Sequence, residues 1–222
     1  DTDTYNVAVG YQAAVKLTTG ITNTAVGGLA LEENTTGNGN TAVGYLAGQE
    51  NTTGATNTAV GQEALQKNTT ASNNVAVGYQ ALEENTTGTE NVAIGAYALD
   101  ENTTADDNVA IGYQALTDST TGGACTAVGK TALANNTTAD YNTALGYQAL
   151  FTNTTGASNT AVGKNSLVNA TTASNNTAVG ADAGASLTTG AHNTAVGTYA
   201  LDANTTADQN TSVGYGSLSD CT

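Results

Sequence analysis

Hydrophobic and polar residues follow a pattern along this chain that returns every 17 residues without insertion or deletion. Each unit reads Asn-Thr/Val-Ala-Val-Gly-Tyr-x-Ala-Leu-x-x-Asn-Thr-Thr-Gly/Ala-x-x, and we number its positions 1 to 17. Twelve full units run from Asn6, and a 13-residue partial unit begins at Asn210. A fixed period of this kind is typical of stacked repeat proteins. The sequence therefore predicts a single array over residues 1–222, with no second domain.

Positions 1–5 predict a short strand that ends at a glycine turn, as in the Asn-Val-Ala-Ile-Gly of residues 91–95. Val, Ile and Thr favour strands, while Asn and Gly are turn residues. Positions 2 and 4 share one face of such a strand, and positions 3 and 5 share the other. Neither face is charged, which is typical of a strand buried on both sides. We expect the Val/Thr face to line the inside of the coil, and the flat Ala/Gly face suits a close-packed neighbour, either another side of the same coil or another chain.

The second half of the unit is compatible with either a second short strand or a helical turn. In two of the three units where position 9 is not Leu, at Ala14 and Gly184, position 12 becomes Leu, at Leu17 and Leu187, whereas the third unit has Gly48 and Asn51. This exchange suggests that both positions reach the same core slot and favours a turn-like path. A 17-residue coil cannot bury a core alone, so stacking predicts an all-β solenoid, a parallel β-roll, with Asn ladders at positions 1 and 12. Thirteen coils at ~4.8 Å would make a rod roughly 60 Å long.

Position 5 is glycine in every unit, which predicts positive φ or a close backbone approach. These structural repeat positions are Gly10, Gly27, Gly44, Gly61, Gly78, Gly95, Gly112, Gly129, Gly146, Gly163, Gly180, Gly197 and Gly214.

A second periodicity of 34 residues lies on top of the first. Position 15 is Gly in odd units and Ala in even units, Gly37 excepted. Position 6 carries a tyrosine in odd units only, at Tyr11, Tyr45, Tyr79, Tyr113, Tyr147 and Tyr215. The alternation fits a 34-residue double repeat with two unlike coils or one wide coil, and it equally fits duplication of a 34-residue genetic unit without structural meaning. The tyrosines form either a surface-contact stripe for carbohydrate or simple packing.

Charge excludes several classes of partner. The chain has 19 Asp+Glu against four Lys and no Arg, a net charge of -15, which disfavours nucleic acid and anionic membrane surfaces. No apolar run approaches the ~18 residues that span a bilayer, and no leader sequence is visible. Without any Met, the chain reads as a processed product or a segment of something longer. A hydrophobic content of 39 % with one Phe and no Trp is thin for a conventional enzyme domain.

The residues needed for catalysis are missing, so we expect no enzyme. The one histidine, His192, occupies a turn position, and no nucleophile elbow, P-loop or Cys/His cluster is present. We expect no cofactor and no strong metal site. The adjacent carboxylates indicate solvated acidic turns, with weak Ca²⁺ binding between stacked turns as the alternative. These pairs are Glu32/Glu33, Glu83/Glu84, Asp100/Glu101 and Asp106/Asp107.

The two cysteines replace ladder asparagines, Cys125 at position 1 and Cys221 at position 12. More than five coils, or about 27 Å, would separate them, which predicts no bond within one chain, whereas a bond between chains stays open. Eight asparagines at position 12 begin a formal glycosylation sequon that we interpret as a structural turn. They are Asn34, Asn51, Asn68, Asn85, Asn102, Asn136, Asn153 and Asn204.

The Asn-Val-Ala-Ile-Gly of residues 91–95 and 108–112 resembles the core motif of YadA-type trimeric autotransporter adhesin heads. The full unit is similar to repeat arrays of phage tail fibres and bacterial surface proteins, many of which end in a self-cleaving intramolecular chaperone domain. The resemblance covers the whole chain and implies a left-handed parallel β-roll assembled as a trimer. The unit here is about three residues longer than the adhesin repeat of about fourteen and has a fixed Thr-Thr.

These observations predict a structural or adhesive rod of an extracellular fibre, such as a phage tail fibre, surface adhesin or extracellular filament. The expected location is extracellular, on a cell surface or on a virion. The expected partners are further copies of the chain, as a trimer or filament, and a host-surface glycan or protein receptor. The alternative is an ice-binding β-solenoid, although adjacent Thr residues in a strand point to opposite faces. A polysaccharide depolymerase is the third hypothesis, without a cleft-forming insertion to support it.

Overall fold

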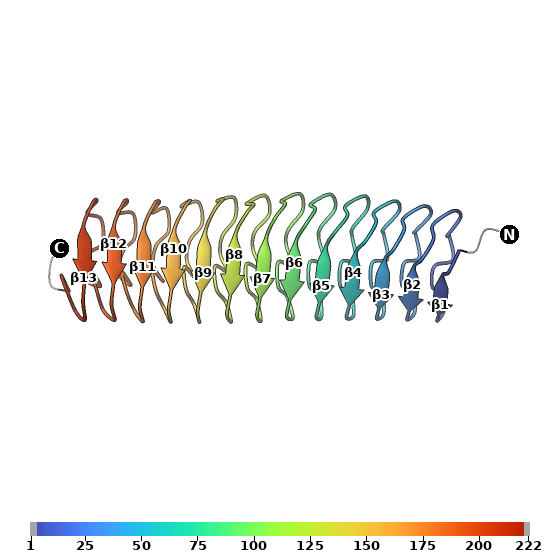
Figure 1. Ribbon diagram of the computed structural model, residues 1–222, viewed down its shortest axis with the longest axis horizontal. Coiled ribbons are helices and arrows are strands. Elements are labelled where there is room, and N and C mark those ends of the chain that lie inside the picture. The colour runs from blue at the N-terminus through green and yellow to red at the C-terminus, as the bar shows by residue number, and fades with distance from the viewer. Residues whose placement is uncertain (1–3, 220–222) are drawn as a thin grey trace. The chain divides into compact units, whose positions relative to one another are not determined.

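The computed structural model describes residues 4–219 and divides the chain into two compact units, Asp1–Asn108 and Val109–Thr222. Both are parallel β-solenoids with 17-residue coils, and no helix occurs among the described residues. Figure 1 shows that the strands of each unit lie side by side and point the same way. The prediction of an all-β solenoid with 17-residue coils is confirmed.

Each coil contributes one three-residue strand at positions 2–4. In the first unit these are β1 (Val7–Val9), β2 (Thr24–Val26), β3 (Thr41–Val43), β4 (Thr58–Val60), β5 (Val75–Val77) and β6 (Val92–Ile94). In the second unit they are β7 (Val109–Ile111), β8 (Thr126–Val128), β9 (Thr143–Leu145), β10 (Thr160–Val162), β11 (Thr177–Val179), β12 (Thr194–Val196) and β13 (Thr211–Val213). Neighbouring strands within a unit pair in parallel and in register, so each residue faces its equivalent one coil away, as Ala25 faces Ala42. The wide 34-residue coil is therefore wrong.

The interior of the coil is built from small side chains, opposite to the expectation from sequence. The strand alanine at position 3 is fully buried, as at Ala25, together with Ala30 and Leu31 from positions 8 and 9. The Val and Thr side chains at positions 2 and 4 point outward and are partly exposed. The prediction that the Val/Thr face lines the inside is wrong, because a closed 17-residue coil leaves room for a methyl group opposite the leucine and no more.

The second half of each coil is neither a strand nor a helical turn. Positions 6–11 form consecutive turns in which positions 7 and 9 adopt left-handed φ, at Leu29 (62°) and Leu31 (50°) in the second coil. A side chain in this region costs about 1–2 kcal/mol. The conformation is stabilised by ladder bonds in both directions, since Leu29 N donates to Tyr11 O at 2.8 Å and Leu31 N donates to Ala47 O at 3.0 Å. The turn-like path suggested by the leucine exchange is confirmed, and Leu187 at position 12 is fully buried.

In the coils that keep both repeat asparagines, at positions 1 and 12, these side chains close the ring and link it to its neighbours. At position 1, Asn40 N donates to Asn23 Oδ1 at 2.9 Å, and Asn40 Nδ2 crosses its own coil to Gly54 O at 2.8 Å. At position 12, Asn51 Nδ2 donates to the same Gly54 carbonyl at 3.0 Å. The predicted ladders are therefore present, and the same bonds close each coil.

The ladder at position 12 is interrupted where the repeat deviates. Asn153 Nδ2 donates to Asn136 Oδ1 at 2.9 Å, but Asn153 Oδ1 is buried and accepts no hydrogen bond. The following coil has Ala170 at this position and offers no amide. A buried carbonyl oxygen without a donor costs about 1–3 kcal/mol. The rest of the coil must therefore compensate for this break.

The glycines of position 5 have φ between 124° and 144° in all thirteen coils. Neighbouring glycines in a stack also approach each other closely. A Cβ on Gly112 would lie 2.6 Å from the carbonyl oxygen of Gly129, and one on Gly146 would lie 2.5 Å from that of Gly163. Only a residue without a side chain fits both requirements.

Candidate interaction surfaces

The outer face of the sheet is the first candidate surface, and we call it the sheet face. It consists of positions 2 and 4 of every strand, which are Thr or Val followed by Val, Ile or Leu. No position-4 side chain inside the stack is buried: they range from half-buried, as at Val60 and Val162, to 46 % exposed at Leu145. No charged residue occupies either position in any strand. The sheet face is thus a regular, uncharged ladder of branched side chains along each unit.

The threonines of position 13 do not form a second surface of this kind. Their hydroxyls donate to the carbonyl of the equivalent residue in the next coil, as from Thr35 Oγ1 to Thr52 O at 3.0 Å. The neighbouring position-14 side chains, such as Thr36, are exposed at the turn. Position 2 therefore carries the threonine row that lies within the sheet face, and the exposed position-14 threonines form a separate row at the turn.

The tyrosines of position 6 lie on the edge next to the sheet face and are all exposed, from 39 % at Tyr79 to 81 % at Tyr215. Some pack on tyrosines of adjacent coils. The ring of Tyr79 makes an edge-to-face contact with Tyr97 at 5.2 Å between centroids, and Tyr199 contacts Tyr215 in the same way at 5.9 Å. Such pairs contribute about 0.5–1.5 kcal/mol. The position-6 tyrosines, which we call the tyrosine column, are therefore exposed to solvent even where their rings contact tyrosines of adjacent coils.

Two lysines share the tyrosine column, and the sequence interpretation missed them. Position 6 carries Lys130 in coil eight, between Tyr113 and Tyr147, and Lys164 in coil ten, between Tyr147 and Ala181. Lys130 Nζ lies 5.8 Å from the centroid of the Tyr113 ring, within the range of a cation–π contact. Reading position 6 across even units as well as odd ones would have found both.

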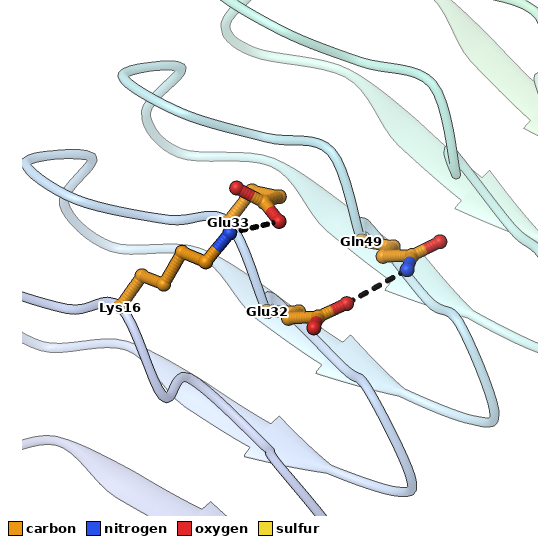
Figure 2. Close-up of polar contacts among 4 residues, drawn as sticks. All are labelled: Lys16, Glu32, Glu33 and Gln49. Carbon is orange, nitrogen blue, oxygen red and sulfur yellow. Dashed lines mark hydrogen bonds and ion pairs between the residues drawn. The ribbon is translucent and has the colours of Figure 1, made fainter.

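The carboxylates of the Glu32/Glu33 pair do not converge on a shared site. Figure 2 shows Lys16 and Gln49 on the two coils that flank the Glu32/Glu33 pair. Lys16 Nζ pairs with Glu33 at 2.5 Å, whereas Gln49 Nε2 donates to Glu32 at 2.8 Å. The two carboxylates therefore make contacts with different neighbouring coils rather than with a shared ligand.

The other acidic pairs vary in their surroundings. Lys67 pairs with Glu84, and Asp106 Oδ1 accepts bonds from Thr89 N at 2.6 Å and from Thr89 Oγ1 at 3.0 Å. Burial, followed by the negative charge of Glu83, raises the pKa of Asp100 to about 7. Within residues 4–219 no group of three His, Cys, Asp or Glu side chains is arranged to hold a metal ion.

The remaining candidates occupy structural places. His192 is exposed at a turn, with φ of 61° and its N–H donated to Ser174 O at 3.2 Å. Cys125 is buried, and its Sγ lies 3.3 Å from Ala139 O, where other coils place the Nδ2 of asparagine. Burial raises the pKa of the Cys125 thiol to about 11. Cys221 lies outside the described residues, so a bond between the two cysteines is untested.

The sequon asparagines are buried in the coil interior, from Asn34 in the second coil to Asn204 in the twelfth. In the ladder the amide nitrogen, which is the atom that a glycan modifies, donates to the position-15 carbonyl, as from Asn68 Nδ2 to Ala71 O at 3.0 Å. This arrangement agrees with the interpretation of the motif as a structural turn.

Comparison with known proteins adds no relative, since no family model, curated protein or solved structure matches the chain. No helix among residues 4–219 is long and apolar enough to cross a membrane. The resemblance to adhesin heads and tail-fibre repeats stays an expectation from sequence. What the molecule itself establishes is a β-solenoid repeat protein with an outward, uncharged sheet face and an adjacent tyrosine–lysine edge.

Proposed function

We propose that this chain is the rod of an extracellular structural or adhesive fibre and that it assembles with copies of itself through the sheet face. The observation that carries the proposal is the exposure of position 4, a branched apolar side chain in every strand. Soluble monomers rarely leave a contiguous apolar surface of this kind uncovered. Covering it would bury the ladder of Val, Ile and Leu side chains away from water.

A second copy of the chain is the occupant that fits this face best. Its own sheet face has the same spacing from strand to strand and the same lack of charge, so the two ladders would match along their length. The net charge of -15 would oppose such an assembly if it lay on the face. The acidic pairs instead occupy positions 10, 11, 16 and 17, in the turns. Three copies are the expected number, as the resemblance to adhesin heads implies.

Sedimentation equilibrium tests the proposal, because it measures the mass of the particle in solution, which can be compared with the 22.0 kDa of a single chain. We expect a species of about three times that mass and elongated particles in negative-stain images. Val162→Glu places a carboxylate on the sheet face of β10 and should yield monomers with an unchanged circular dichroism spectrum. Thr155→Glu, at an exposed turn of the preceding coil, is the matched control and should keep the assembly. A monomeric parent protein would contradict the proposal.

Ice binding is a second candidate, and one observation favours it. Nine of the thirteen strands place a threonine at position 2 beside the branched residue at position 4, both facing outward. The objection from the adjacent threonines of positions 13 and 14 does not apply to this row, because its residues are two apart and share a face. Thermal hysteresis that Val162→Glu abolishes would support ice binding. Absence of both hysteresis and inhibition of ice recrystallisation would reject it.

A further inference from the structure

The second unit carries an unusual run on its tyrosine–lysine edge. Position 6 of four successive coils reads Tyr113, Lys130, Tyr147 and Lys164, and we call this the cationic strip. The four residues are stacked directly on one another. Each position-6 carbonyl accepts the N–H of position 7 in the next coil, at 2.9 Å from Thr131 to Tyr113, at 3.2 Å from Gln148 to Lys130, and at 2.9 Å from Asn165 to Tyr147.

Both lysines of the strip are available to a ligand. Among the described residues, ion pairs join Lys16 to Glu33 and Lys67 to Glu84. Lys130 and Lys164 are exposed and have no described carboxylate oxygen within 4.0 Å. Tyr113 and Tyr147 are exposed by 46 % and 44 %, so the strip presents ring surface as well as charge.

The sequence around the cationic strip lacks the strong negative charge of the rest of the chain. Residues 109–175 contain two carboxylates, Asp118 and Asp140, against Lys130 and Lys164, a net charge of zero in a chain of -15. Asp140 Oδ1 already accepts the N–H of Gly123 at 2.8 Å. In the coil after the strip, the carboxylate of Asp182 accepts Asn165 Nδ2 at 2.9 Å. The local field therefore does not repel an anion as the rest of the chain would.

We propose that the cationic strip binds a linear acidic glycan, with the lysine ammonium groups on sugar carboxylates and the tyrosine rings against the sugar rings. An ammonium–carboxylate hydrogen bond is charge-assisted, and a tyrosine offers a flat apolar ring with a polar tip. Stacked coils place the two lysines ~9.6 Å apart and the two tyrosines at the same interval, twice the ~4.8 Å strand spacing. This interval suits a polymer in which charge recurs along the chain. The inference rests on the proposed adhesive fibre and names the class of its receptor.

The test is binding of the full chain to immobilised polygalacturonate, with its fully methyl-esterified form as the uncharged probe. We expect binding to the polyuronate that weakens as salt rises and little binding to the ester. The double variant Lys130→Gln/Lys164→Gln should lose about tenfold or more in affinity, and Tyr113→Ala/Tyr147→Ala should also weaken binding. Lys16→Gln/Lys67→Gln removes the same charge elsewhere and is the matched control.

Three outcomes overturn the inference: no binding to the polyuronate, equal binding to the ester, or an equal loss of affinity in both lysine double variants. Thermal unfolding followed by circular dichroism shows that each variant is folded. Sedimentation equilibrium on the same samples separates this inference from the fibre proposal. A parent protein that assembles but does not bind the polyuronate rejects only the strip, whereas a monomeric parent protein that still binds the polyuronate rejects only the assembly.

Discussion

The backbone N–H of Ala55 donates a 3.0 Å hydrogen bond to Oγ of Ser72, the residue at the same position one coil further along. This contact explains part of the 34-residue periodicity. At position 16 the even coils carry an acceptor side chain that takes the N–H of the preceding odd coil, as Asp140 does for Gly123 and Ser174 does for Ala157. The double repeat therefore has structural content, although the coil is 17 residues long.

Replacing the acceptor tests this contact. Ser72→Ala should lower the free energy of unfolding by about 0.5–1.5 kcal/mol, because Ala55 N–H loses its partner in a half-buried turn. Urea denaturation followed by circular dichroism measures the change. Thr70→Ala, at an exposed position of the same coil, should stay within about 0.5 kcal/mol of the parent protein. Equal effects of the two variants would show that the hydrogen bond contributes nothing.

Two adjacent glycines, Gly27 and Gly28, test whether position 5 tolerates a side chain. Gly27 has φ of 137°, and a Cβ there would lie 2.7 Å from the carbonyl carbon of Gly44. At Gly28 the nearest atom to a Cβ is Tyr45 Cδ2 at 3.3 Å, on an exposed ring that can move. We expect Gly27→Ala to destabilise by more than about 3 kcal/mol and Gly28→Ala by about 1 kcal/mol or less, measured by thermal unfolding. Similar melting temperatures for the two variants would contradict this account.

The asparagine ladder should be the main polar contribution to stability. Asn85 is fully buried, donates to Asn68 Oδ1 at 3.0 Å and to Gly88 O at 2.9 Å, and accepts from Asn102 Nδ2 at 2.8 Å. Asn85→Ala leaves several of these buried groups unpaired, so we expect a loss of about 2–4 kcal/mol in guanidinium denaturation. Thr87→Ala, at an exposed turn of the same coil, is the matched control. A loss at Asn85 no greater than at Thr87 would reject the ladder as a source of stability.

The raised pKa of Asp100 predicts an unusual pH dependence. Its ordinary value of 3.8 rises to about 7, chiefly through burial, and its Oδ1 is buried without a hydrogen-bond partner. The folded state thus keeps a proton that the unfolded chain has released, so stability falls as pH rises from about 4 to about 7. The pKa of Glu83 is raised as well, chiefly by burial, and adds to the same trend.

Denaturation midpoints between pH 4 and pH 8 measure this effect with Asp100→Asn as the test variant. The variant keeps the shape of the side chain without its charge, so it should flatten the profile. At pH 8 it should gain on the order of 1–2 kcal/mol, a figure reduced for the solvent that reaches this half-buried group. Glu90→Gln, which removes a charge from an exposed turn, should leave the slope unchanged. A profile that Asp100→Asn does not alter would refute the assignment.

The candidate surfaces were only partly readable from the sequence. The tyrosines were found because they recur at one position, whereas Lys130 and Lys164 were missed because they are absent from most units and blur the consensus. The sheet face was assigned to the interior, since both faces of the strand are uncharged and an alternating pattern cannot tell which of two apolar sides is enclosed. The partial burial of Asp100 and its raised pKa had no sequence signal, because the same position holds other half-buried carboxylates, Glu32 and Glu83, in other coils.

The sequence by itself determined the 17-residue period, the short strand, the glycine at its end and the two asparagine ladders, because each is marked by a narrow set of residue types that recurs at one place in most or all coils. The tertiary structure alone decided which side of the strand is inside. When 17 residues close into a ring, the interior accommodates the alanine of position 3 against the leucine of position 9, and the larger Val, Ile and Leu side chains of position 4 must point outward. For this steric reason the Val/Thr face, which the sequence predicted to be the core, is the outer surface on which the proposed assembly depends.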